Sequence, residues 1–186
     1  MIVYFSGTGN SKYVAQRIAM ALNEECQSIE TAEPKLTLKK GEYLGFVSPT
    51  HWWEQPYLMR VFLSKLVVEN CNASNHIFSV STYGSNAGAI VEDTRYQLRQ
   101  KGLELKAGFS IMMPDNWTPL FDLSDKAAVA KQNEEADKVI TSIIAHLRKR
   151  EEGVFGDHDF PYDLQAGEEW INHRDRHTSQ FYVESH

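Results

Sequence analysis

The sequence is poor in cysteine and contains no long hydrophobic segment. Only Cys26 and Cys71 occur among 186 residues, which excludes a disulfide framework, and without a CxxC pair we expect no zinc, iron–sulfur or dithiol chemistry. No apolar run approaches the roughly 18 residues of a membrane span. The first residues lack the basic flank and cleavage site of a signal peptide. We therefore expect a cytoplasmic protein.

An excess of positive charge is also missing. The formal net charge is −6, and nucleic-acid binding needs a basic patch that displaces counterions. We therefore expect neither a nucleic-acid nor a membrane partner. Residues 1–150 carry 17 Lys and Arg against 16 Asp and Glu, whereas residues 151–186 carry 2 against 9. The acidity belongs to the C-terminal segment.

The chain does contain short apolar runs that alternate with amphipathic helical stripes, which predicts an α/β fold with a parallel sheet. Five strands are predicted, at residues 2–6, 27–30, 43–48, 77–82 and 103–113. Helical stripes fall within residues 11–22, 58–66, 87–98 and 136–147. Segment 31–41 favours a loop because it contains Pro34 and polar residues. Glu92 and Asp93 are expected to lie on a solvated helix face.

The pattern divides the chain into one domain, residues 1–150, and a C-terminal segment, residues 151–186. Beyond Arg150 glycines, prolines and charges interrupt the periodicity, while aromatic residues such as Phe160 and Trp170 remain. His173 and His177 have the i, i+4 spacing of metal ligands on a helix. The neighbouring Arg174 and Arg176 oppose a cation, so we expect no metal site.

A glycine-punctuated segment, Ser6–Ser11, links the first strand to the first helix and reads SGTGNS. Backbone N–H groups, hydroxyls and a helix N-terminus can converge there on one phosphate monoester. The alternative is an ordinary helix N-cap after a glycine turn. The segment has neither the Walker A spacing, the cysteine of a low-molecular-weight phosphatase nor the acidic residues of a phospho-receiver domain. We therefore favour a phosphate cradle.

Two further loops follow predicted strands and carry aromatic residues. Ser48–Pro56 reads SPTHWWEQP, with two adjacent tryptophans, and Ser81–Gly88 reads STYGSNAG. In an open α/β sheet both loops lie at the ligand-binding edge. Aromatic faces on two sides of a gap suit a flat ring system. The alternative is that the aromatic side chains pack under the loops as core.

These loops resemble those of flavodoxins, whose phosphate motif reads T-x-T-G-N-T or a close variant. The closer resemblance is to the flavodoxin domain of bacterial flavodoxin/ferredoxin fusion proteins, which share FSGTGNS, STYG and the Met-Pro-Asp-Asn-aromatic stretch found at Met113–Trp117. The resemblance covers roughly residues 1–150. It implies a flavodoxin-like three-layer sandwich whose five-stranded parallel sheet has the order 2-1-3-4-5, the arrangement for which flavodoxin itself is the reference example.

The resemblance also implies FMN as cofactor and assigns the residues that bind it. The phosphate would be held by Ser6, Gly7, Thr8, Gly9, Asn10 and Ser11. One face of the isoalloxazine would be lined by Pro49, Thr50, His51, Trp52 and Trp53. The other face would be lined by Thr82, Tyr83, Gly84 and Gly88. Asn116 and Trp117 would close the rim.

The function implied by the resemblance is electron transport by an FMN-binding carrier, with a redox protein such as a ferredoxin-like domain as partner. One alternative is an FMN-dependent oxidoreductase of the quinone or protoporphyrinogen type on the same scaffold. Another is an interaction module that has lost its cofactor. No NAD(P)H-binding motif is visible and no catalytic residue is assigned, which favours the carrier.

Two features depart from the flavodoxin pattern. Flavodoxins often have a glycine in the first aromatic loop, but residues 50–56 contain none, so we expect weak stabilisation of a one-electron-reduced flavin. The near-neutral body also offers little long-range field to steer a partner. In the fusion proteins a stretch much like Phe181–Val183 leads to a ferredoxin-like module. We therefore expect residues 151–186 to be an interdomain connector or its remnant; the alternative is an ordinary acidic, aromatic C-terminal tail that covers the body.

Overall fold

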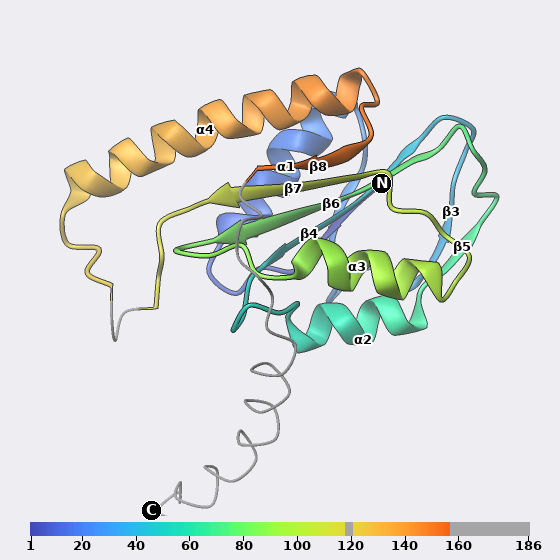
Figure 1. Cartoon of the computed structure of the whole chain (residues 1–186), viewed down its shortest axis with the longest axis horizontal. Helices are drawn as coiled ribbons and strands as arrows, with labels where there is room; N and C mark the ends of the chain where they lie inside the picture. The colour runs from blue at the N-terminus through green and yellow to red at the C-terminus, as the bar shows by residue number, and fades with distance from the viewer. Residues whose placement is uncertain (118–120, 157–186) are drawn as a thin grey trace, which may run out of the picture.

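The computed structural model describes residues 1–117 and 121–156, which form a three-layer α/β sandwich (Figure 1). The central sheet contains β1 (Ile2–Tyr4), β2 (Cys26–Ser28), β4 (Tyr43–Pro49), β6 (His76–Tyr83), β7 (Ala107–Met112) and β8 (Gly153–Phe155). The helices are α1 (Asn10–Leu22), α2 (Tyr57–Lys65), α3 (Ile90–Arg99) and α4 (Lys126–Arg148). Helices α1 and α4 cover one face of the sheet, and α2 and α3 cover the other.

The two faces of the sheet are buried by alternate residues of the same strands. Ile2 and Val47 pack in the core beneath α1 and α4, whereas their neighbours Val3 and Phe46 pack in the core beneath α2 and α3. Successive side chains of a strand point to opposite faces, so strands covered on both sides must be apolar throughout. In β6 all eight residues are buried. This is why the apolar runs predicted the central strands correctly.

The strand order is β2-β1-β4-β6-β7-β8, and every pair is parallel. The five predicted strands keep the expected order, but the prediction of a five-stranded sheet is wrong because β8 adds a sixth strand beside β7. The predicted strand at 103–113 is shorter, Ala107–Met112. Segment 31–41, predicted to be a loop, contributes β3 (Lys35–Thr37), which pairs with β5 (Val67–Glu69) in a separate two-stranded sheet.

Aromatic packing holds β8 on the sheet. The ring of Phe155 stacks on Phe109 with centroids 5.2 Å apart and lies 4.4 Å from the His146 ring of α4. The sheet therefore includes residues on both sides of position 150, the expected domain boundary. The expected connector beyond residue 156, with His173 and His177, lies outside the described residues.

The topology places four loops at one edge of the sheet. The chain leaves β1 toward β2 on one side and later returns to β4 on the other side of β1. The loops after β1, β4, β6 and β7 all follow the carboxyl ends of strands, where the reversal of strand order opens a crevice. Across residues 1–117 and 121–156, none of the helices is long and apolar enough to cross a membrane.

A buried histidine lies at the opposite edge of the sheet. His76 is 3% exposed, and its Nε2 atom has no hydrogen-bond partner among residues 1–117 and 121–156. Its ring meets Tyr43 edge-on at 5.9 Å, and the Arg150 guanidinium lies 4.5 Å from the same Tyr43 ring. Burial lowers the pKa of His76, with smaller contributions in the same direction from Arg150 and Lys106 and an opposing one from Glu152. The folded chain therefore holds His76 neutral.

We expect this histidine to make the fold acid-sensitive. Below pH 6.5 the unfolded chain binds a proton at His76 that the folded chain does not yet bind, so the free energy of unfolding falls, by at most ~1.4 kcal/mol per pH unit. His76→Phe keeps the ring contact with Tyr43 and removes the titration. Urea unfolding at pH 7, 6 and 5 should give a flatter pH dependence for the variant. An unchanged slope would show that His76 does not contribute.

Candidate functional site

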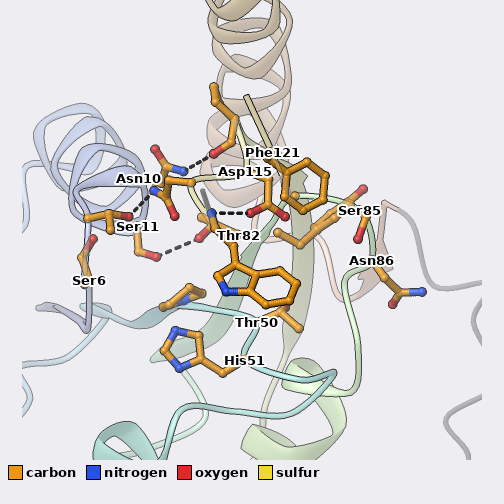
Figure 2. A pocket seen from close by; sticks show the side chains of 18 of the residues that line it. Ser6, Asn10, Ser11, Thr50, His51, Thr82, Ser85, Asn86, Asp115 and Phe121 are labelled. Atoms are coloured by element: carbon orange, nitrogen blue, oxygen red, sulfur yellow. Dashed lines mark hydrogen bonds between the residues drawn. The ribbon is translucent and has the colours of Figure 1, made fainter. Parts of the chain in front are cut away.

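The four loops enclose a cavity of about 570 Å³ (Figure 2). All the residues predicted for the site line it except Gly9 and Gly88. It is also lined by Phe121 and by four residues of the predicted motifs that were not assigned to the site, Ser85, Asn86, Pro114 and Asp115. Figure 2 shows Ser6, Asn10 and Ser11 on one side of the cavity and Ser85 and Asn86 on the other. The phosphate motif and the second aromatic loop therefore face one space.

One end of the cavity lies at the N-terminus of α1. Gly9 precedes the helix with φ 112°, no side chain of the part of the chain that the structure describes caps the first turn, and that turn contains no acidic residue. A Cβ atom at Gly7 or Gly9 would meet no atom of the described residues within 4 Å, so this backbone is open to a ligand. Uncapped N–H groups at a helix N-terminus carry a partial positive charge. This end of the cavity is suited to an anion.

Hydroxyl groups surround the same end of the cavity. Ser6 Oγ accepts a hydrogen bond from Gly9 N at 3.1 Å, and Thr8 Oγ1 accepts one from the Asn116 amide. Ser11 Oγ and Thr82 Oγ1 share a buried hydrogen bond of 2.8 Å. Since each hydroxyl has one proton, Ser6 and Thr8 keep theirs for a ligand. One proton of the Ser11–Thr82 pair also stays available.

The first aromatic loop turns without a glycine. Trp52 and Trp53 have φ angles of 51° and 62°, each at a cost of about 1–2 kcal/mol. Two backbone hydrogen bonds between His51 and Glu54, of 3.0 and 3.1 Å, offset this strain. The indoles are 51% and 43% exposed. The lack of glycine therefore does not keep this loop out of the left-handed region.

The two aromatic loops pack against each other through their backbones. A Cβ atom on Gly88 would lie 2.3 Å from the Trp53 carbonyl oxygen. Ala89 N donates to that oxygen at 2.7 Å, and Thr50 Oγ1 donates to Ala87 O at 2.7 Å. Gly88 was predicted to line the cavity, but it lies behind the first aromatic loop because only a residue without a side chain permits this approach.

A polar network anchors the first aromatic loop to α3. Gln55 is 2% exposed, its backbone N–H donates to Asp93 Oδ2 at 3.1 Å, and its amide donates to Thr94 Oγ1 at 2.9 Å. Burial raises the pKa of Asp93. The prediction that Asp93 lies on a solvated face is wrong, since helical periodicity does not reveal which loop packs on a polar residue.

His51 is a titratable side chain of this loop that lines the cavity. Its ring meets Phe5 edge-on at 6.1 Å and is accessible from the cavity. Desolvation by the surrounding protein lowers the pKa of His51, so the imidazole is neutral at pH 7. A neutral imidazole can accept a proton.

The loop after β7 packs against the second aromatic loop at Gly84. A Cβ atom on Gly84 would lie 2.0 Å from Asp115 Oδ2 and 2.4 Å from Asp115 Cβ. Asp115 in turn accepts a hydrogen bond from Trp117 N at 2.9 Å. Because Gly84 has no side chain, there is room for the Asp115 side chain in the cavity wall.

We expect Gly84→Ala to lower the free energy of unfolding by about 1–3 kcal/mol, because the new methyl group displaces the Asp115 side chain. In an Asp115→Gly background the same change should cost much less, since the obstructing atoms are gone. Urea unfolding of the four proteins of this cycle measures the difference. An equal cost in both backgrounds would contradict the proposed contact.

Comparison with known proteins gives one family. The family model described as a flavodoxin domain matches residues 1–141. No curated protein matches the sequence. Solved structures that resemble the chain include a flavodoxin from the domain Archaea, with 17% identity, a TM-score of 0.45 and coverage of 79% of this chain and 96% of that one. Flavodoxin 2 from Bacillus cereus has 20% identity, a TM-score of 0.44 and coverage of 76% and 97%.

The match over residues 1–141 spans every element from β1 to the middle of α4, and with them the four loops around the cavity. It covers well over half of the 186 residues. On this match, the chain belongs to the flavodoxin family.

Proposed function

We propose that this chain is an FMN-binding electron-transfer protein. The observation that carries the proposal is one cavity with an uncapped helix N-terminus at one end and exposed indoles at the other. Its volume of about 570 Å³ falls in the range of roughly 300–1,000 Å³ that is usual for small-molecule and cofactor sites.

The α1 end of the cavity would hold the FMN phosphate. The N–H groups of the first turn and the hydroxyl protons of Ser6 and Thr8 are donors, and a phosphate monoester supplies several acceptor oxygens and a matching charge. The Ser11–Thr82 pair would add one further donor. No carboxylate in the first turn of α1 opposes the anion.

The aromatic loops would hold the ring system. Trp52 and Trp53 contribute half-exposed indoles, and Tyr83 lines the same cavity from the end of β6. Stacking and apolar burial against such rings favour a planar heterocycle. The bound flavin would supply one- and two-electron redox chemistry, and the protein residues would orient it and exclude water. A redox protein such as a ferredoxin-like domain would approach over the exposed tryptophans.

A visible spectrum of the purified protein tests the proposal. Protein freed of ligand and then incubated with flavins should take up one FMN per chain and prefer it to riboflavin and FAD. Stepwise anaerobic reduction should bleach the bound flavin reversibly. Failure of the folded chain to bind FMN would overturn the proposal. The remaining alternative would then be an interaction module that has lost its cofactor.

A second candidate, an FMN-dependent oxidoreductase, is favoured by His51. Its neutral imidazole lines the cavity, and no hydrogen bond to the ring occurs within the described ranges. Such a group could take a proton from a substrate bound beside the flavin. Steady-state reduction of quinones by NAD(P)H separates the two functions. Turnover by the wild-type protein that is lost in His51→Phe would establish the enzyme. Negligible turnover by the wild-type protein would favour the electron carrier.

A further inference from the structure

The loop after β7 is tied to the phosphate motif by two side-chain amides. Asn10 Nδ2 donates to Pro114 O at 3.0 Å, and Asn116 Nδ2 donates to Thr8 Oγ1. The partners are separated by 104 and 108 residues in sequence, so these contacts form only in the folded chain. They join the anion-binding end of the cavity to the strand on its far side.

The same loop carries part of the aromatic rim. Trp117 directly follows Asn116, and its ring lies 6.1 Å from the Trp52 ring at an interplanar angle of 65°. Its backbone N–H donates to Asp115 Oδ1 at 2.9 Å. One residue, Asn116, therefore stands between a hydroxyl suited to bind phosphate and an indole suited to contact the ring system.

We propose that Asn116 is a positioning residue that couples the phosphate end of the cavity to its aromatic rim. The Thr8 hydroxyl accepts from Asn116 and keeps its own proton for an anion. Hydrogen bonds in such a chain strengthen one another, so an anion that accepts from Thr8 also tightens the bond that holds Asn116. Binding at one end then orders Trp117 at the other, and the two ends of a single ligand bind cooperatively.

This inference rests on the proposed function for the identity of the ligand, and it predicts an effect on a ligand without phosphate. Thr8→Val should weaken riboflavin about 2- to 12-fold, the usual loss for one neutral hydrogen bond. Asn116→Ala should weaken riboflavin by a similar factor. The double variant should be no weaker than either single variant, because both remove the same link. Additive losses would contradict the coupling.

The closing experiment uses inorganic phosphate and the ligand-free protein, with NMR signals from the Gly7 and Gly9 amides and from the Trp117 indole. Phosphate should shift all three signals in the wild-type chain. In Asn116→Ala it should still shift the two glycine amides but leave the indole unchanged. The Asn10–Pro114 bond remains in this variant and supports the loop. Asn133→Ala changes an exposed asparagine of α4 that is not among the residues lining the cavity, and it should respond as the wild type does.

The outcomes separate this inference from the proposed function. An indole that responds equally in Asn116→Ala, or stays still in the wild type while the glycine amides shift, overturns the coupling. If phosphate shifts neither glycine amide, the phosphate site of the proposed function fails. The coupling is then decided without ligand: Thr8→Val and Asn116→Ala should move the Trp117 indole signal alike, and an unmoved signal in Thr8→Val overturns it.

Discussion

Replacing Ser6 by alanine and Thr8 by valine together should lower the affinity for FMN about 10²- to 10⁴-fold, since each hydrogen bond to a charged group contributes about 1.5–3 kcal/mol. Riboflavin, which has no phosphate, should weaken by no more than about 12-fold through the link from Thr8 to Asn116. The ratio of the two affinities therefore isolates the phosphate contribution.

Calorimetric titration of the ligand-free variants with each flavin measures this ratio. Ser85→Ala is the matched control, because it removes a hydroxyl from the cavity wall at a distance along the chain from the phosphate motif. The control should keep the wild-type preference for FMN. Equal losses of FMN and riboflavin in the double variant would mean that Ser6 and Thr8 only shape the loop.

The sequence predicted the parts of the fold that long patterns determine. The buried strands β4 and β6 read as apolar runs because helices cover both faces. Strands β3, β5 and β8 each have three residues and are largely exposed, so no apolar run marks them, whereas the three residues of β1 are apolar and mostly buried. The position of β8 depends on the stacking of Phe155 on Phe109, a contact between segments that no local pattern connects.

The sequence predicted which loops form the candidate site, but it did not predict the contacts between those loops. Strand ends and unusual motifs located the cavity residues, including His51 and Trp117. Asp115 was part of a quoted motif, but its place in the cavity wall depends on Gly84, which lies on another strand end. Gly88 was predicted to line the cavity, but it does not. Its role is a backbone contact with Trp53, and only the three-dimensional packing reveals that contact.

Gly88→Ala should have the second large effect, because the new side chain would disrupt that backbone contact. Gly88 has φ +62°, and its Cβ would lie 2.3–2.6 Å from three Trp53 backbone atoms. The left-handed conformation costs an alanine about 1–2 kcal/mol. The contact adds about 1–3 kcal/mol or more, because backbone atoms cannot rotate away. The first aromatic loop should therefore be pushed out of place, with loss of both stability and flavin binding.

Gly102→Ala separates the two causes. Gly102 has φ +70°, but a Cβ there would meet nothing within 4 Å among residues 1–117 and 121–156, so this variant carries only the conformational cost. Its Tm should fall by about 2–8 °C with flavin affinity unchanged, whereas in Gly88→Ala the Tm should fall further and flavin affinity should drop. Thermal unfolding and FMN titration of both variants measure this difference. Equal effects in the two variants would show that the contact between Gly88 and Trp53 does not hold the aromatic loops together.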